Sequence, residues 1–297
     1  MLTAATNMLL RRTVRRWFDS EPDLPTVRRK LDALIARTDA LSAQYSVTQT
    51  GQADGAALHL IAPKQALPAG APLTLYFHGG GYMVGGLASH AAFCARLARA
   101  TGGSVLFADY RLAPEHRFPA AFDDGVAAYA AAAARAGGKL FVAGDSAGGG
   151  LALAVAQAAR AASGREPDGL ILFSPWADLT LSGASMAANA ATDVMLSTKI
   201  LMRMRAAYLG AHDPADKRAS PLFDPNAHLP PVLLIYSATE VLRDDSTRLA
   251  AQLGGAGTRV VNVPFRGMPH VFPLFRILPS AGRALRAVAD FAAAPAG

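Results

Sequence analysis

The stretch FVAGDSAGGGLALAV, residues 141–155, decides the fold of this chain. It begins as a short apolar run, breaks at Gly144, and continues as an Ala- and Leu-rich run typical of a helix. Ser146 lies at the break, between Gly144 and Gly148, in the pattern Gly-x-Ser-x-Gly. Small neighbours allow a sharp strand-to-helix turn that exposes the serine hydroxyl. The stretch therefore predicts a strand, a tight turn with a candidate nucleophile, and a helix.

The rest of the chain repeats this alternation of strand and helix. Short β-rich runs occur at 73–77, 104–108, 139–143, 170–173, 232–236 and 259–263. Helical stretches lie at 90–101, 120–135, 151–162, 245–253 and 282–293. Buried strands that alternate with helices predict an α/β fold, with a mostly parallel sheet covered on both faces. A further strand at 57–61 is expected to add to one edge of the sheet.

Two regions depart from the alternation. Residues 1–45 contain apolar side chains at helical spacing from Leu10 to Phe18 and a second helical segment from Val27 to Leu41. Residues 181–228 contain the helix-like LSTKILMRMRAAYLG and a loop rich in Pro and Asp. We expect 46–180 and 229–297 to form the main α/β domain. Residues 1–45 and 181–228 are then the two parts of a helical cap over the carboxyl edge of the sheet.

Charge and composition narrow the class of protein. The 297 residues are 52% hydrophobic and 17% charged, which is typical of a globular domain. The net charge is +7, and residues 1–30 hold seven basic and three acidic side chains, a net of +4. Such a start could contact nucleic acid or anionic lipid. The apolar residues between the arginines instead favour an amphipathic helix packed on the protein, so we expect no nucleic-acid partner.

Compartment and metal content also follow from the sequence as expectations. No uninterrupted apolar run reaches the ~18 residues of a membrane span, so stable membrane insertion is not expected. The first residues do not have the order of a secretory signal, which favours a cytoplasmic protein. Cys94 is the single cysteine and excludes a disulfide within the chain or a cysteine-rich metal site.

A glycine-rich segment, FHGGGYMVGG, follows the strand at 73–77 directly. Glycines let backbone N–H groups approach a developing negative charge closely. The spacing of a phosphate-binding loop is missing, since neither Gly-x-Gly-x-x-Gly before a helix nor a Gly-Lys-Ser/Thr ending occurs here. We therefore expect an oxyanion hole formed by the N–H groups of Gly79, Gly80 and Ala147.

Four segments together resemble one protein family. HGGGYMVGG (78–86), DYRLAPEHRFPAAFDD (109–124), GDSAGG (144–149) and SPWADLT (174–180) resemble the hormone-sensitive-lipase-type esterases of the α/β-hydrolase superfamily. The resemblance extends from about residue 70 to the end of the chain. It implies an α/β-hydrolase fold with about eight strands and a helical cap. It also implies a serine carboxylesterase for short- to medium-chain esters that needs no cofactor and no metal.

The remaining members of a catalytic triad must follow the serine in the order acid, then histidine. Of the seven histidines, His270 in GMPHVF comes just after the last predicted strand and is the expected base. The family usually has an aspartate where this chain has Glu240, in YSATEVLRDD, 30 residues before His270. Asp244 remains the alternative acid, although it is expected, with Asp245, to start the next helix.

Substrate contacts are the least specific part of the sequence. Tyr82, Met83, Trp176 and Met195, with Leu196 and Met202, are candidates for an acyl pocket. The expected partner is a small-molecule ester. An amidase, a lactonase or a deacetylase would use the same triad, and receptors of this fold bind small molecules in an inactive site. The sequence leaves these alternatives open, together with the oligomeric state, including a homodimer.

Overall fold

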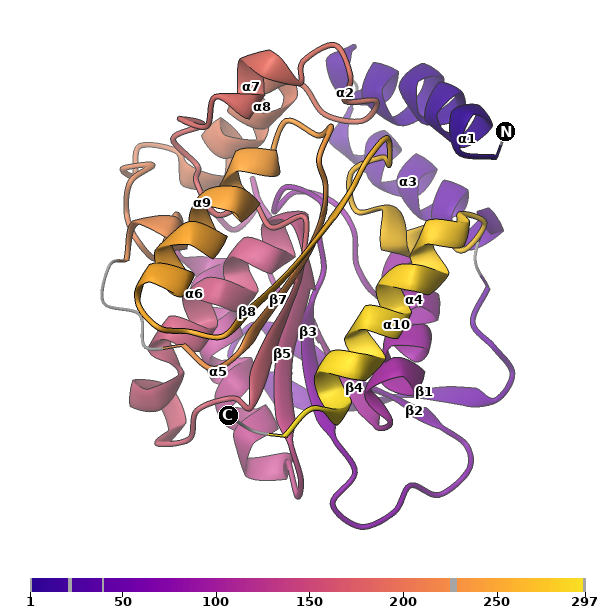
Figure 1. The fold of residues 1–297 in the computed structure, drawn as a ribbon, viewed down its shortest axis with the longest axis vertical. Helices are drawn as coiled ribbons and strands as arrows, with labels where there is room; N and C mark the ends of the chain where they lie inside the picture. Colours follow the sequence, from indigo (N-terminus) through magenta and orange to yellow (C-terminus); the bar gives the residue numbers. More distant parts are fainter. Residues whose placement is uncertain (1, 21–22, 39, 225–228, 296–297) are drawn as a thin grey trace.

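The computed structural model describes residues 2–20, 23–38, 40–224 and 229–295. Its centre is an eight-stranded sheet with the order β1-β2-β4-β3-β5-β6-β7-β8 (Figure 1). The strands are β1 Tyr45–Ala53, β2 Ala56–Pro63, β3 Leu73–Phe77, β4 Ser104–Asp109, β5 Leu140–Asp145, β6 Gly169–Phe173, β7 Val232–Ser237 and β8 Val260–Phe265. Strands β3 to β8 are parallel to one another, as the alternation predicted.

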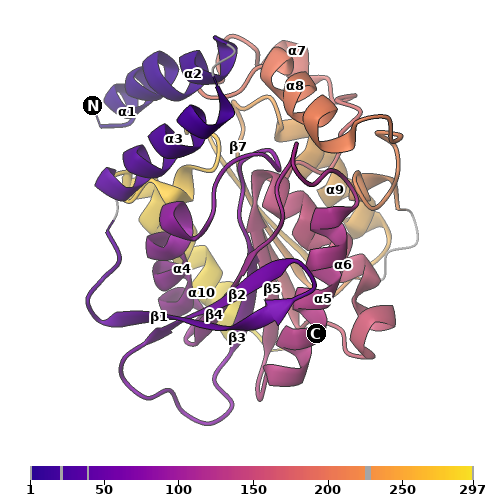
Figure 2. The same cartoon turned by 180° about the vertical axis from the view of Figure 1, so that it is seen from behind.

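Helices cover both faces of the sheet, as Figures 1 and 2 show. They are α4 Leu87–Thr101, α5 Ala120–Arg135, α6 Ser146–Ser163, α9 Arg243–Gly255 and α10 Pro279–Ala293. Successive strand residues point to opposite faces. In β5, Leu140 and Val142 therefore join the apolar cluster under α5 and α6, whereas Phe141 and Ala143 join the cluster under α4 and α10. This burial on both faces explains why β5 has no alternation of apolar and polar residues from Leu140 to Ala143.

The edge of the sheet differs from the prediction. The strand expected at the edge, residues 57–61, belongs to β2, which lies between β1 and β4 and is antiparallel to both. β1 occupies the edge, and its central residues are polar and exposed. Asp54, with φ of 52°, and Gly55 connect β1 to β2 in a tight hairpin. The apolar pattern missed β1 because an edge strand buries little of its surface.

The remaining helices lie at the carboxyl end of the parallel strands (Figures 1 and 2). They are α1 Leu2–Leu10, the π-helical η1 Arg11–Arg15, α2 Arg16–Asp19, α3 Leu24–Thr38, α7 Ser185–Ala188 and α8 Thr198–Leu209, with short 3-10 helices η2 Pro221–Phe223 and η3 Phe272–Leu274. The described parts of both regions expected to form a cap therefore contain helices, and α2 lies against α8. No helix in the described ranges is long and apolar enough to cross a bilayer.

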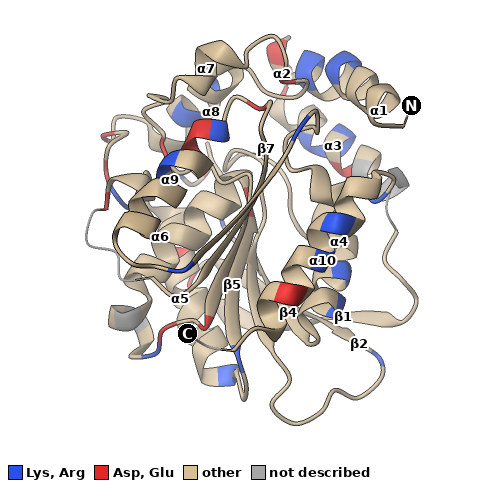
Figure 3. Cartoon of the chain, in the orientation of Figure 1, with Lys and Arg blue, Asp and Glu red and all other residues tan. Residues whose placement is uncertain are grey.

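The N-terminal helices are rich in basic residues, drawn blue in Figure 3, and several of these residues bond to the protein itself. Arg28 donates to the carbonyl oxygens of Met83 and Ala113 and pairs with Glu115. Arg203 of α8 donates to the carbonyl oxygen of Phe18 across 2.6 Å. These bonds fix α2 and α3 onto the main domain and onto α8.

Candidate active site

Ser146 lies at the sharp turn between β5 and α6. Its φ of 53° is in the left-handed region, which costs a non-glycine residue about 1–3 kcal/mol and is tolerated where packing enforces it. Gly148 supplies that packing, because a Cβ there would overlap the carbonyl oxygens of Phe77 and His78. A Cβ at Gly144 would likewise overlap the carbonyl of Gly148. The glycines around Ser146 are therefore required for β3, β5 and α6 to approach one another closely.

Three buried side chains form a continuous hydrogen-bonded series. Ser146 Oγ lies 2.8 Å from His270 Nε2, and His270 Nδ1 lies 2.5 Å from Glu240 Oε2. Burial alone would lower the pKa of His270, but the adjacent Glu240 carboxylate outweighs it, and the pKa of His270 is raised above its usual value. A histidine so oriented can accept the Ser146 proton at Nε2 while its Nδ1–H is held by Glu240.

Glu240 is fixed by further hydrogen bonds. Its second carboxylate oxygen, Oε1, accepts from Ser174 Oγ at 2.8 Å and from the N–H of Ser237 at 2.9 Å. Ser237 Oγ in turn donates to the carbonyl oxygen of Met268, two residues before the histidine. The loops that carry the acid and the base are thus connected to each other as well as through the imidazole.

The alternative acids lie elsewhere. Asp244 Oδ2 accepts from the N–H of Ser185, and its Oδ1 pairs with Arg243. Asp245 Oδ2 accepts from the N–H groups of Ala177 and Asp178. Both aspartates therefore lie at the start of α9 and hold backbone N–H groups of residues 177, 178 and 185, and of the three acids only Glu240 is bonded to His270.

The glycine loop differs from the prediction in one donor. The N–H of Gly79 donates to Asp145 Oδ1 across 2.8 Å, so it is not directed at a substrate oxygen. The expectation that Gly79 contributes to the oxyanion hole is therefore wrong in this structure. Gly80 and Gly81 line the cavity beside Ser146, and within the described residues their N–H groups have no intramolecular acceptor. Ala147 is at the start of α6, where backbone N–H groups lack helical partners.

His78 supports the loop from behind rather than facing the cavity. Its Nδ1 bonds to the carbonyl oxygen of Gly79 at 2.7 Å, and its ring stacks on Tyr110 at 4.4 Å. Burial, aided by the charge of His90, lowers the pKa of His78 to about 3. His78 is therefore neutral near pH 7 and fixes the geometry of the loop.

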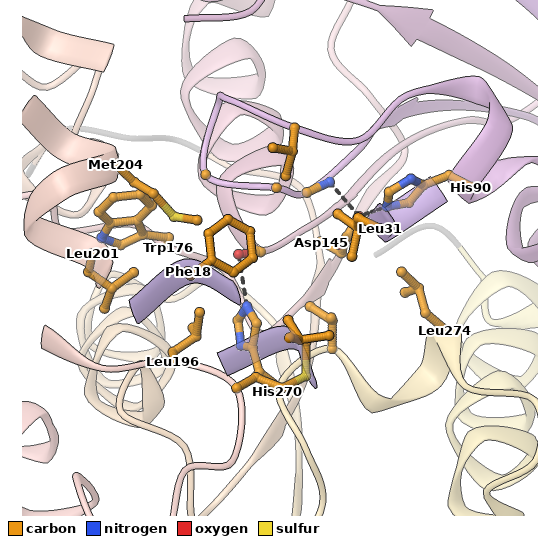
Figure 4. Close-up of a pocket in the computed structure, with 18 of the residues that line it drawn as sticks. Phe18, Leu31, His90, Asp145, Trp176, Leu196, Leu201, Met204, His270 and Leu274 are labelled. Atoms are coloured by element: carbon orange, nitrogen blue, oxygen red, sulfur yellow. Dashed lines mark hydrogen bonds and ion pairs between the residues drawn. The ribbon is translucent and has the colours of Figure 1, made fainter. Parts of the chain in front are cut away.

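An apolar cavity opens directly above Ser146. Its volume free of protein atoms is about 840 Å³, including its opening to solvent. In Figure 4, Trp176, Leu201 and Met204 lie on one side of His270, and His90, Asp145 and Leu274 lie on the other. The N-terminal helices complete the wall with Val14, Phe18, Leu31 and Leu34.

The predicted pocket residues divide into two groups. Trp176, Met195 and Leu196 line this cavity. The other three do not. Tyr82 is buried and stacks on Tyr208 with ring centroids 3.8 Å apart, Met83 lines a separate small pocket, and Met202 is exposed.

Several residues of the site were missed by sequence reasoning. They are Ser174, which bonds to Glu240, Asp145, which holds Gly79, and Asp193, which bonds to the loop after Glu240. Ser174 and Asp145 lie inside segments that sequence analysis had singled out, so their place in the motifs was an available signal. Asp193 carried no such signal. Within the described ranges, no group of three or more His, Cys, Asp or Glu is arranged to hold a metal.

Comparison with known proteins agrees with this geometry. A family model for the α/β-hydrolase fold matches residues 74–274. An acetyl-hydrolase of Streptomyces hygroscopicus is 40% identical over 220 residues, which cover 73% of this chain and 74% of the relative. An esterase of Acinetobacter venetianus is 37% identical over 225 residues, 74% of each chain.

Solved structures extend the similarity to nearly the whole chain. The crystal structure of an esterase from the bacterial hormone-sensitive lipase family superposes with a TM-score of 0.89 at 31% identity, covering 98% of this chain and 97% of that one. This chain belongs to the α/β-hydrolase family, as a hormone-sensitive-lipase-type esterase.

The range matched by the family model lies within the part of this esterase that resembled the family in sequence. The matched range begins within β3 and ends at Leu274, so it includes the glycine loop, Ser146, Glu240 and His270. An esterase/lipase from an uncultured bacterium also superposes over 98% of this chain, with a TM-score of 0.89 at 33% identity. The similarity in structure therefore includes the N-terminal helices, which the family model does not cover.

Proposed function

We propose that the esterase hydrolyses short- to medium-chain carboxylic esters through an acyl-enzyme on Ser146. His270 is the general base and acid, and Glu240 orients it. The observation that carries this proposal is the buried series from Ser146 Oγ through His270 to Glu240, which opens onto an apolar cavity. A nucleophile, a base and an orienting carboxylate in hydrogen-bond contact are what acyl transfer requires.

The reaction follows from these contacts. His270 Nε2 takes the Ser146 proton as Oγ attacks the ester carbonyl, and the carbonyl oxygen becomes an oxyanion. We propose that the N–H groups of Gly80, Gly81 and Ala147 bind it. The imidazolium then protonates the alkoxide as the C–O bond breaks, which releases the alcohol. A water, deprotonated by His270, then attacks the acyl carbonyl. The imidazolium of His270 returns that proton to Ser146 Oγ as the bond between the acyl carbon and Oγ breaks, which releases the carboxylic acid.

The cavity supports a neutral acyl chain as substrate. Apart from Asp145, His90 and the triad, the residues on its wall are apolar or glycine. Placing a charged acyl group there would cost desolvation without a compensating partner. We further propose that residues 1–45 and 181–228 act as the cap, because their side chains form much of this wall.

The test is a panel of nitrophenyl esters from acetate to palmitate with wild type and Ser146→Ala. We expect hydrolysis that is strongest for the shorter chains, and a loss of about 10⁴-fold or more in kcat for Ser146→Ala, since only the attacking oxygen is removed. Ser163→Ala, at the other end of α6, is the matched control and should retain activity. A serine-directed organophosphate should label Ser146 alone. Substantial activity in Ser146→Ala would contradict the proposed mechanism.

An inactive, ligand-binding protein of the same fold is the second candidate. It is favoured only by the fold itself, because receptors of this architecture bind small molecules in the same place. If no ester in the panel is hydrolysed and an ester analogue binds without turnover, the receptor function replaces the esterase function. Anilide and lactone substrates in the same panel distinguish an amidase and a lactonase.

A further inference from the structure

Asp193 lies outside the triad, in the segment between α7 and α8, and is only 3% exposed. Its carboxylate accepts three backbone hydrogen bonds. Oδ1 accepts from the N–H groups of Met195 and Leu196, both at 2.8 Å. Oδ2 accepts from the N–H of Val241 at 2.9 Å. One side chain thus joins two residues of the cavity wall to the residue that follows Glu240.

The backbone of Asp193 is held from the other side. Arg15 Nη1 of η1 donates to the Asp193 carbonyl oxygen at 2.5 Å, and Arg11 donates to the carbonyl of Ala191 at 2.9 Å. The N-terminal helices therefore contact the segment that contacts the acid loop. Arg15 and Val241 bond to the same residue, so Asp193 connects the N-terminal helices to the loop of Glu240.

The same segment makes a second contact with the acid loop. Asn189 Nδ2 donates to the carbonyl oxygen of Glu240 at 2.8 Å. Both polar groups of the peptide unit that joins Glu240 to Val241, the carbonyl oxygen and the N–H, are thus bonded to residues 189–193. The Glu240 carboxylate must reach His270 from a backbone position that these bonds fix, and displacement of a catalytic group by about 1 Å can cost on the order of 10²-fold in rate.

We propose that Asp193 is a positioning residue that aligns Glu240 with His270 and links this alignment to the docked N-terminal helices. The inference rests on the proposed roles of Ser146, His270 and Glu240. It adds to them a connection between the docked N-terminal helices and the catalytic carboxylate. Asp193 touches neither substrate nor the reacting atoms in this role; it acts through Val241 and Glu240.

The first test is Asp193→Asn, which keeps the volume of the side chain. The amide oxygen can retain the two bonds from Met195 and Leu196, and the amide nitrogen then faces the Val241 N–H, where two donors repel each other. We expect kcat on nitrophenyl acetate to fall by roughly 10- to 100-fold with little change in KM. A kcat close to that of wild type, with or without a raised KM, would show that the position of Glu240 does not depend on Asp193, and the proposal would be overturned.

The pH profile separates positioning from a general loss of structure. The charges that raise the pKa of His270 come from Glu240 first, then Asp193 and Asp145. Loss of the Asp193 charge, together with a displaced Glu240, should move the acid limb of kcat/KM to lower pH. Asp178→Asn is the matched control, since Asp178 is also buried and holds backbone N–H groups at Thr180 and Ser182. It should lower thermal stability and leave the acid limb in place.

A second variant tests the link to the N-terminal helices, and its kcat can be measured even if Asp193→Asn does not fold. Arg15→Gln should lower kcat several-fold. Its effect should largely disappear when combined with Asp193→Asn, because the hold of Arg15 on the Asp193 backbone reaches Glu240 through the side-chain bond to Val241, which Asp193→Asn already removes. Arg16→Gln, an exposed neighbour, is the control. An unchanged kcat in Arg15→Gln, or full additivity in the double variant, would overturn the link.

The failure of this inference is distinguishable from failure of the proposed function. If Ser146→Ala is inactive while Asp193→Asn has the wild-type kcat and acid limb, the esterase mechanism stands and the positioning role is wrong. If Ser146→Ala retains activity, the proposed function itself is wrong.

Discussion

The carboxylate of Asp145 accepts the N–H of Gly79 across 2.8 Å and so joins the residue before the nucleophile to the glycine loop. The same oxygen accepts from the Tyr76 hydroxyl at 2.6 Å. Burial would raise the pKa of Asp145, but nearby His90 and these hydrogen bonds outweigh it and lower the pKa. The carboxylate is therefore charged near pH 7. Its hydrogen bond to the Gly79 N–H holds the glycine loop in its position.

This relationship predicts different results for two substitutions of Asp145. Asp145→Asn keeps an oxygen for Gly79 and Tyr76, so kcat on nitrophenyl acetate should remain within about tenfold of wild type. Asp145→Leu leaves the Gly79 N–H and the Tyr76 hydroxyl without an acceptor, so the glycine loop is no longer held in its position. We expect it to lower kcat by about 10²–10³-fold, the loss found when one oxyanion-hole donor is removed. Steady-state kinetics beside thermal unfolding tests this. Equal losses in both variants would show that the charge, not the hydrogen bond, matters.

The raised pKa of His270 predicts the pH dependence of activity. Only neutral His270 can take the Ser146 proton, so activity should be low in acid and rise as pH passes the pKa of His270. Since Glu240 raises that pKa, the midpoint of the acid limb of kcat/KM should lie above 6.5. Residual activity of Glu240→Gln should show the midpoint at lower pH. A wild-type midpoint well below 6.5, or no movement in the variant, would contradict this account.

Glu240 and Asp244 are separated by three variants. In Glu240→Gln, the amide oxygen can keep the bonds from Ser174 and Ser237, which leaves the amide nitrogen facing His270 Nδ1 and disfavours the working tautomer. We expect a loss in kcat approaching ~10⁴-fold, as for the corresponding change in serine proteases. Glu240→Asp should be milder because the charge remains.

Asp244→Asn serves as the control in this series. From the start of α9, its carboxylate holds the N–H of Ser185, the first residue of α7, so the change should lower thermal stability and affect kcat far less. A severe loss in Asp244→Asn beside a nearly normal Glu240→Gln would make Asp244 the acid. Measurement of kcat and thermal unfolding for all three variants gives the answer.

Phe18 and its neighbour Trp17 provide a matched pair for the cavity wall. Phe18 lines the cavity above Ser146, whereas Trp17 packs beside Lys30 and does not line it. Phe18→Ala should enlarge the cavity and raise the ratio of kcat/KM for octanoate over acetate several-fold. Trp17→Ala should lower stability by about 3 kcal/mol or less, since it is only partly buried, and leave that ratio unchanged. A changed ratio in Trp17→Ala alone would mean that Phe18 does not limit the acyl chain.

The main elements of the fold could be predicted because each carries its own local signal. The apolar runs of β3 to β7 require burial on both faces, and the helical stretches between the strands require a parallel arrangement. β1 lacked that signal. The dipeptide Asp54-Gly55 is typical of a hairpin turn between two strands, and it was the available sign of β1. The start of α6 at Ser146 rather than Leu151 was missed because a glycine-rich first turn does not look helical.

The sequence by itself determined the candidate nucleophile, the candidate base and the position of the candidate acid. The glycines that permit the turn at Ser146 are a local signal, and the order of a triad follows the chain. Only the tertiary structure decided which N–H groups of the glycine loop remain free and which carboxylate reaches His270. It also decided which apolar residues line the cavity. Tyr82 and Met195 were equal candidates in the sequence, but Met195 lines the cavity and Tyr82 stacks on Tyr208. These outcomes depend on distances between segments far apart in the chain. Asp193 is the clearest case, because its significance comes entirely from Arg15 and Val241, residues that lie 178 and 48 positions away.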